Sequence, residues 1–346
     1  MKNKLFLRIV LALCCVACIL PFAACTKEEP TPTEPFALLD KHEVIISDIG
    51  TGRIVVADLD KEDPFAEENL IWEWAPTEEQ GWDFITPDTM IDRLAAVKYR
   101  WSEHFKTNVV LFAGAGGVAG MIEYPSGKCL WKVRVGQSPH SIELLPNGDI
   151  VVASSGGGDW AEGRLYYYQL QADGTYQATT EHMLNGAHGV LWDPDNEVLW
   201  ALGFPELVAY NMTKTSDGKA SLIKLQDWGC EVPDGTGHDL MPDYSDPDIL
   251  WLTDNVSIMK FSKSENKILT EYPNSKKLNV MPTVKGVTSF TDGVVVFVSY
   301  GDATGNGHPH TVRGYWPKED GTFEMVKFTD EDYGFNKIRV FTTDYL

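Results

Sequence analysis

The chain has 346 residues, a length that allows two or three ordinary domains or one large one. It contains 50 Asp and Glu residues against 29 Lys and Arg residues, which gives a formal net charge of -21. This excess of negative charge argues against nucleic-acid binding and against adsorption to anionic membranes through the protein surface.

Residues 1–24 are predicted to be a secretory signal peptide. Lys2, Lys4 and Arg8 precede a short apolar stretch, and small residues follow it before Cys25. The segment 22–25, Phe-Ala-Ala-Cys, resembles the lipobox of bacterial lipoproteins, with Phe where Leu is more usual. This resemblance implies that Cys25 becomes a lipidated N-terminus. The alternative is an ordinary secretion signal that is cut nearby.

Residues 25–36 are expected to form a lipidated tether, because Pro and charged residues favour an extended, semi-rigid chain. The segment 27–29, Lys-Glu-Glu, resembles the acidic signal that sends some Gram-negative lipoproteins to the outer face of the outer membrane. We therefore expect the domain at 37–346 to be anchored in the outer membrane and to face the cell exterior. It would contact the membrane through its lipid alone.

A four-strand unit repeats along the rest of the chain. Six runs of β-branched, aromatic and aliphatic residues end in Gly, Ser or Asp, as buried strands do, and they begin at Glu43, Asn108, Asp149, Glu197, Asp248 and Gly293. An amphipathic strand follows each run, and usually a fourth strand follows that one. Five of the runs are preceded by a strand that opens with Lys or His.

Six such units predict an all-β protein, a six-bladed β-propeller. The sixth opening strand is found in residues 337–345, where it would complete the first blade and close the ring. Seven blades are the alternative, because residues 75–96 have room for further strands. We interpret that stretch as an insertion with a short helix, in which Thr86 is the N-cap, Pro87 is the first helical residue and Asp88 lies in the first turn.

The opening residues of the six units are expected to form one ring, because the innermost strands of a propeller line its central channel. In ring order these residues are Lys337, Lys98, His140, His188, His238 and Lys285. Two positions further on, Arg100 and Arg339 could replace Lys98 and Lys337 without changing the charge pattern.

This ring supports three interpretations. In an anion-binding funnel, the lysines supply charge and the histidines donate hydrogen bonds to a carboxylate, sulfate or phosphate. In a metal site, His140, His188 and His238 converge on a divalent ion such as zinc, manganese or iron, with a position open for water or substrate. The third interpretation is that polar residues line a wet channel without serving any ligand.

Two Gly-rich loops on the same face carry further candidates for ligand binding. One loop contains Asp159 and Trp160, and the other contains His308 and His310. Long Gly-rich loops often carry function, and a Trp there would suit stacking on a sugar face. The alternative is that Gly and Asp only form turns and that Trp packs between blades.

The opening pattern, His followed by Gly, Ser or Asp and then an aliphatic residue, resembles two families of extracellular propeller enzymes. In peptidyl-hydroxyglycine lyases, histidines at comparable blade positions hold zinc. In arylsulfate sulfotransferases, similar segments frame a sulfated substrate; the matches here are His238-Asp239 and the segment 145–148, Leu-Pro-Asn-Gly. Over nearly its full mature length, the chain is similar to six-bladed propeller lipoproteins of glycan-foraging Gram-negative bacteria, a family without an established activity.

We therefore expect a monomeric outer-membrane lipoprotein that binds a small anionic ligand over its channel, with a charged saccharide as the favoured class. One alternative is a metal-dependent lyase or group-transfer enzyme that uses the three histidines on an anionic substrate. Another is a platform for protein interactions. The sequence identifies neither the ligand nor a reaction.

Overall fold

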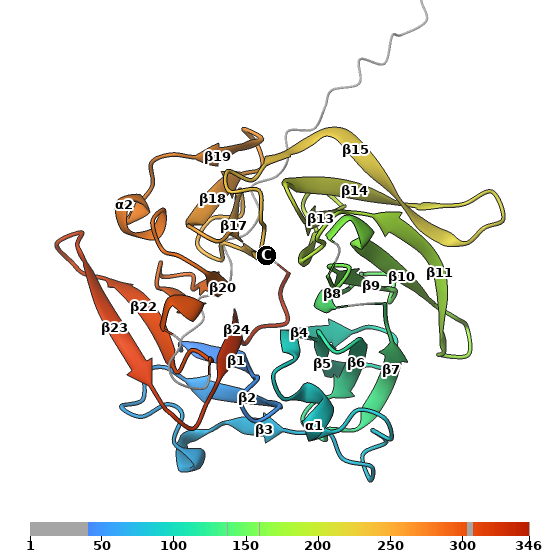
Figure 1. Ribbon diagram of the computed structural model, residues 1–346, viewed down its shortest axis with the longest axis horizontal. Helices are drawn as coiled ribbons and strands as arrows, with labels where there is room; N and C mark the ends of the chain where they lie inside the picture. Colours follow the sequence, from blue (N-terminus) through green and yellow to red (C-terminus); the bar gives the residue numbers. More distant parts are fainter. Residues whose placement is uncertain (1–40, 137, 159, 303–306, 346) are drawn as a thin grey trace, which may run out of the picture. The chain divides into compact units, whose positions relative to one another are not determined.

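Six four-stranded antiparallel sheets follow one another around a central axis in the computed structural model (Figure 1). The structure describes residues 41–136, 138–158, 160–302 and 307–345. The prediction of an all-β, six-bladed propeller is confirmed, and the seven-bladed alternative is wrong. The expected signal peptide and tether, with Cys25, lie outside the described residues.

Each blade runs from an innermost strand at the channel to an outermost strand. Blade 1 contains β24 (Phe335–Val340), β1 (Glu43–Asp48), β2 (Arg53–Asp58) and β3 (Trp72–Trp74). Blade 2 contains β4 (Leu94–Ser102), β5 (Thr107–Gly114), β6 (Val118–Glu123) and β7 (Cys129–Arg134). Blade 3 contains β8 (Pro139–Leu144), β9 (Ile150–Ser154), β10 (Arg164–Leu170) and β11 (Tyr176–Met183).

The other three blades follow the same order. Blade 4 contains β12 (Gly189–Asp193), β13 (Val198–Leu202), β14 (Glu206–Lys214) and β15 (Ala220–Glu231). Blade 5 contains β16 (Asp239–Pro242), β17 (Ile249–Thr253), β18 (Ile258–Ser262) and β19 (Lys267–Leu269). Blade 6 contains β20 (Val284–Ser289), β21 (Val295–Ser299), β22 (Thr311–Pro317) and β23 (Phe323–Thr329).

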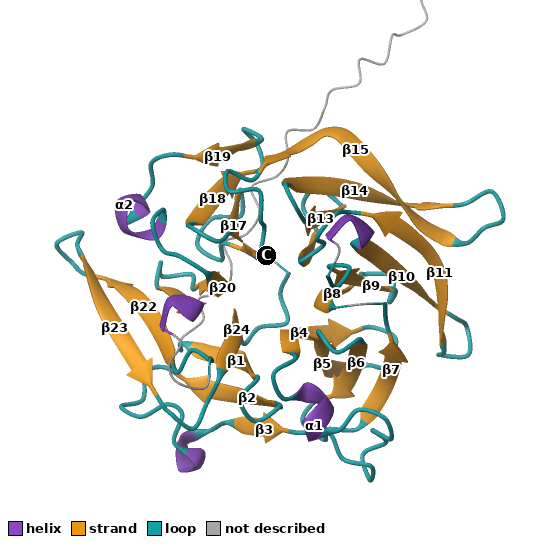
Figure 2. Cartoon of the chain, viewed as in Figure 1, coloured by secondary structure: helices purple, strands orange, loops and turns teal. Residues whose placement is uncertain are grey.

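The helices of the described residues are short and lie in the connections between strands (Figure 2). They are α1 (Pro87–Met90), α2 (Ser275–Leu278) and the 3-10 helices η1 (Glu67–Asn69), η2 (Trp160–Glu162) and η3 (Tyr300–Asp302). None of the helices in this part of the chain has the length and apolar character that crossing a membrane requires.

The core consists of six buried apolar clusters, one at each interface between neighbouring blades. At the interface of blades 1 and 2, the ring of Trp82 lies 5.3 Å from that of Trp74 and 5.4 Å from that of Phe112. Truncating a buried aromatic side chain of this kind to Ala typically costs about 3–5 kcal/mol. Packing between blades therefore holds the ring rigid around the channel.

Residues 75–93 form the expected insertion, and residues 94–96 of the expected range belong to β4 instead. Its helix α1 begins at Pro87, and the backbone N–H of Thr86 donates a 2.9 Å hydrogen bond to Oγ1 of Thr89. The insertion is ordered because it buries apolar side chains, Trp82 and Met90 among them, in the cluster between blades 1 and 2.

Strand β24 closes the ring by pairing with β1, as expected for the C-terminal segment. The pairs are antiparallel and join Val340 to Val44 and Ile338 to Ile46. The strand covers only the first part of the expected range 337–345, because the chain leaves the sheet after Val340.

The residues after β24 cross the middle of the ring (Figure 1). The Tyr345 hydroxyl donates a 2.6 Å hydrogen bond to the carbonyl of Leu144, and the Tyr244 hydroxyl donates a 3.1 Å bond to the carbonyl of Asp344. Leu144 and Tyr244 lie at or just beyond the ends of the innermost strands β8 and β16. This C-terminal tail, residues 341–345, therefore covers the end of the channel where the innermost strands finish.

Candidate functional site

A pocket of about 220 Å³ lies at the other end of the channel, where the innermost strands begin. Five of the six expected ring residues line it: His140, His188, His238, Lys285 and Lys337. The sixth, Lys98, is 1% exposed and lies deeper, in a buried ion pair. The pocket has a closed floor, because charged side chains fill the channel between it and the tail.

The first group of these side chains is Lys98, Arg100 and Glu143. Nζ of Lys98 donates to Oε2 of Glu143 at 2.7 Å, and Nε of Arg100 donates to Oε1 at 2.9 Å. Burial alone would raise the pKa of Glu143, but Arg100 and Lys98 outweigh it and lower the pKa. Glu143 is therefore a buried carboxylate that stays ionised.

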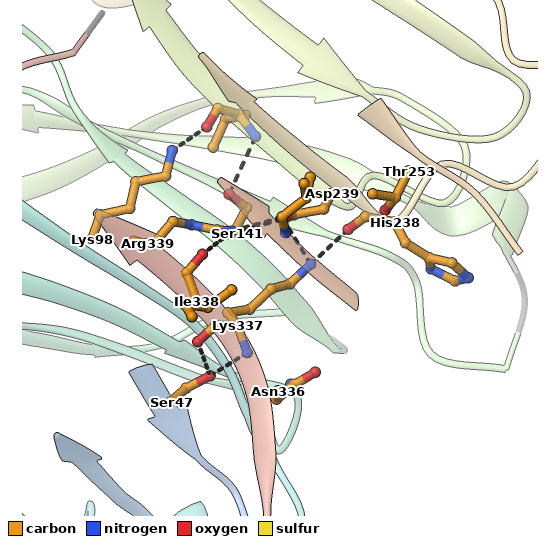
Figure 3. Close-up of polar contacts among 12 residues, drawn as sticks. Ser47, Lys98, Ser141, His238, Asp239, Thr253, Asn336, Lys337, Ile338 and Arg339 are labelled. Atoms are coloured by element: carbon orange, nitrogen blue, oxygen red, sulfur yellow. Dashed lines mark hydrogen bonds and ion pairs between the residues drawn. The ribbon is translucent and has the colours of Figure 1, made fainter. Parts of the chain in front are cut away.

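The second group, Lys337, Arg339 and Asp239, repeats this arrangement on another side of the channel (Figure 3). Nζ of Lys337 lies 3.0 Å from Oδ1 of Asp239, and two nitrogens of Arg339 donate to both carboxylate oxygens at 2.6 and 2.8 Å. Burial opposes ionisation of Asp239, but Arg339 and Lys337 lower its pKa to about 2. In both groups a Lys and an Arg two residues apart share one carboxylate from another blade.

The channel consequently holds more positive than negative charge. Its two groups contain four cations and two carboxylates, a balance of +2 in a chain whose net charge is -21. Burial lowers the pKa of Lys98 and of Lys337 to about 8 in spite of their carboxylate partners, so both side chains remain mainly protonated at pH 7. The floor of the pocket is therefore cationic.

The histidines above this floor are neutral. Burial lowers the pKa of His140 to about 4 and that of His188 well below its usual value. Their Nδ1 atoms lie 2.7 Å from the carbonyl of Ser138 and 2.6 Å from the carbonyl of Gly186. In a neutral ring in this position, Nδ1 carries the proton and donates a hydrogen bond to the carbonyl, while Nε2 carries a lone pair.

His238 has a different environment. Its Nε2 lies 2.9 Å from Nζ of Lys285 and 2.6 Å from Oδ1 of Asn255, and its buried Nδ1 has no hydrogen-bond partner in the described residues. Burial and then the charge of Lys285 lower the pKa of His238 to about 3. Burial and the nearby Lys337 lower the pKa of Lys285 to about 7.

The residues present do not fit the three-histidine metal site. Within the described part of the chain, no group of three or more His, Cys, Asp or Glu side chains is arranged to hold a metal ion. The rings of His140 and His188 instead pack against each other, with 4.1 Å between centroids and a tilt of 38° between their planes. Nε2 of His238 is occupied by Lys285 and Asn255.

The candidate residues on the two Gly-rich loops differ in their position relative to the pocket. Nε2 of His308 lies 2.6 Å from Oδ1 of Asp92, a residue that lines the pocket, so this loop borders the site. Nδ1 of His310 contacts the carbonyl of Tyr333, in the connection between β23 and β24, and His310 is not among the pocket-lining residues. Trp160 begins η2, and Asp159 lies outside the described residues.

Several residues of the site were not singled out from the sequence as pocket residues. Arg93 and Tyr300 line the pocket, and Glu143 holds the cations of its floor. The pairing register of β8 shifts between Pro139 and Ser141, and such a bulge at His140 turns both His140 and Glu143 to the channel. A strict alternation of sides along the strand would have placed them on opposite faces.

One of the comparisons with known proteins supports the fold. Two solved structures are similar. The first is a functionally unknown protein from Desulfotomaculum acetoxidans DSM 771, with a TM-score of 0.51 and 9% identity, and the match covers 89% of this chain and 88% of that one. The second is a protein from Lactobacillus plantarum, with a TM-score of 0.49 and 12% identity, and the match covers 84% of this chain and 85% of that one. At such identities, the first likeness shows the fold alone. No curated protein matches the sequence.

One sequence family matches most of the chain, over residues 7–307, and it is described as a family of unknown function, DUF6528. The chain belongs to the DUF6528 family.

Proposed function

We propose that this propeller binds a small anionic ligand in the pocket at the open end of its channel, with a charged saccharide as the ligand class. The observation that carries the proposal is the cationic floor, four buried Lys and Arg side chains that share two carboxylates. An anion above this floor would interact favourably with its uncompensated charge, and charge interactions are strong where water is excluded.

Lys285 is the residue best placed to contact the ligand. It lines the pocket, and no carboxylate in the described residues pairs with it. An ammonium group that faces a pocket without a carboxylate partner gains from an arriving carboxylate or sulfate. His140 lines the pocket and its Nδ1 already contacts the carbonyl of Ser138, so its Nε2 adds a polar contact that suits a hydroxyl group of a sugar.

An interaction platform has less support. The large apolar side chains exposed in the described residues come from all six blades, among them Ile71, Trp101, Met183, Val256 and Met325. A docking surface normally gathers such residues into one patch. Within the residues that the structure describes, no arrangement of side chains supports the metal-dependent enzyme.

Isothermal titration calorimetry with galacturonic acid and with sulfate tests the proposal. Lys285→Met should weaken binding by about tenfold, because it removes one charged contact. Lys276→Met is the matched control, since Lys276 is an exposed lysine on α2 and does not line the pocket. Equal affinities for the two variants, or no binding of either anion by the native protein, would reject the proposal.

We further propose that the propeller is carried at the outer membrane by a lipid on Cys25, facing the cell exterior. The segment 22–25 supports this proposal through its resemblance to a lipobox. Metabolic labelling with a fatty acid should mark the native chain and leave a Cys25→Ser variant unlabelled.

A further inference from the structure

A second depression adjoins the pocket on the face where blades 2 and 3 begin. It is an open groove of about 510 Å³, and Arg93 and Ala115 line both the groove and the pocket. Arg134, at the end of β7, lies further along the groove. The two depressions are therefore neighbours that share a wall, and Arg93 stands between them.

Both arginines lack a carboxylate partner. Among the described residues, no ion pair or hydrogen bond joins Arg93 or Arg134 to an Asp or Glu, although the chain has 50 such residues. Both side chains are exposed, and the nearby Asp83 pairs with Lys132 instead. Two unpaired guanidinium groups along one groove are unusual in so acidic a protein.

Neighbouring residues position both arginines, and glycines leave part of the groove lining without side chains. The guanidinium of Arg134 lies over the ring of Phe84, 4.6 Å from its centroid, which leaves the edge of the group free for a planar anion. A Cβ atom at Gly116 would come within 2.8 Å of Cδ of Arg93, so glycine at this position makes room for that side chain. Gly117, Gly136 and Gly157 add backbone without side chains to the lining.

The small volume of the pocket also favours a ligand that extends into the groove. Its volume of about 220 Å³ is below the roughly 300–1,000 Å³ that is typical of sites for drug-sized ligands. The pocket therefore suits one small unit, and a longer ligand would continue into the groove.

We propose that the groove is a second anion subsite, so that the protein binds a chain of sugar acids with one carboxylate in the pocket and the next at Arg93 and Arg134. This inference rests on the proposed function of the pocket and extends it from a single anionic unit to an acidic oligosaccharide.

The experiment compares galacturonic acid with its linear trimer by calorimetry at low ionic strength, where charged contacts are least screened. The trimer should bind at least about tenfold more tightly than the monomer, since a charge-assisted contact is worth about this factor and the three carboxylates alone supply only about a threefold statistical gain. Arg134→Gln should remove the advantage of the trimer and leave the affinity for the monomer within twofold.

Arg164→Gln is the matched control, because Arg164 pairs with Glu181 on the outer strands of blade 3. It should leave both affinities unchanged. If the monomer binds and the trimer gains nothing, or if Arg134→Gln weakens both ligands equally, the groove is not a subsite and the proposed function of the pocket stands. If neither ligand binds, the proposed function fails and this inference fails with it.

Discussion

Glu143 and Asp239 determine whether the channel can hold its cations. Each accepts hydrogen bonds from one Lys and one Arg at distances of 2.6 to 3.1 Å, and all of these side chains are buried. A charge removed from water is tolerated only when it is paired and hydrogen-bonded. The two carboxylates are therefore structural residues that make a cationic binding site possible.

Glu143→Gln should destabilise the protein by about 3–5 kcal/mol, because it leaves Lys98 and Arg100 buried without a counter-charge. Lys98→Met should cost much less, since Glu143 keeps two contacts with Arg100. Urea denaturation of both variants measures the difference. Equal losses of stability would contradict this account of the ion-pair group.

The histidines of the pocket make stability depend on pH. Burial lowers the pKa of His140 to about 4, from an ordinary value near 6.5. Between these two values the unfolded chain binds a proton that the folded chain does not, so the free energy of unfolding falls as the pH falls from about 6.5 to 4. Thermal unfolding at several pH values should show this slope, and His140→Gln should reduce it.

His42 provides a control of opposite sign. Burial would lower its pKa, but Asp60 and Asp292 outweigh that effect and raise it. His42 therefore adds stability at low pH and loses it as the pH rises through its raised pKa. His42→Gln should steepen the fall in stability on acidification, and a flatter profile in this variant would contradict the assignment.

The sequence predicted part of the pocket lining, because side chains that open equivalent strands meet in a closed ring. His140, His188, His238, Lys285 and Lys337 meet at the pocket for this reason. The depth of a side chain and its pairing were not predictable, since both depend on bulges and on contacts between blades. Strand β20 has such a register shift between Val284 and Gly286, beside Lys285.

Among the elements, strands and the one capped helix were predictable from local patterns. The apolar runs beginning at Glu43 and Asn108 became β1 and β5, and Pro87 begins α1. Helix α2 and the path of the tail after Val340 were not predicted. Both depend on distant packing, such as the stacking of Phe341 on Tyr99 at 4.2 Å between ring centroids.

The C-terminal tail should contribute to stability without affecting the ligand. Removing residues 343–346 takes away the hydrogen bond from Tyr345 to Leu144, and it also removes the Tyr345 ring, which lies 4.6 Å from the guanidinium of Arg100. We expect a loss of about 2–3 kcal/mol, because the hydrogen bonds of Tyr345 and of the Asp344 carbonyl disappear together with one half-buried aromatic side chain. The measurement is hydrogen exchange of β4 and β8 together with thermal unfolding.

Affinity for an anion should stay within about twofold in this truncated chain, because the pocket lies at the other end of the channel. A large loss of affinity would show instead that the two ends of the channel are coupled.

In the propeller as a whole, closure of the ring depends on the pairing of β24 with β1. Ile338 is fully buried in this pairing and belongs to the cluster between blades 1 and 6. Ile338→Glu should open the ring, because it buries an unpaired charge, and β1 would then present an unpaired edge. Size-exclusion chromatography with light scattering should detect oligomers or aggregates in place of the expected monomer.

Met325→Glu is the control for that experiment. Met325 lies on β23, the outermost strand of blade 6, and is 47% exposed. This variant should remain monomeric with nearly native stability. If Ile338→Glu behaves in the same way, closure of the ring does not depend on this pairing.

Strand β24 also carries Lys337 into the pocket, beside Lys285 of blade 6. A ligand held by both lysines would span two blades, and it would be lost whenever β24 left its place beside β1. Occupancy of the pocket would therefore slow the opening of the ring, and the lifetime of the folded protein against proteases would grow with ligand concentration. A protein with this property would survive longest where its ligand is abundant.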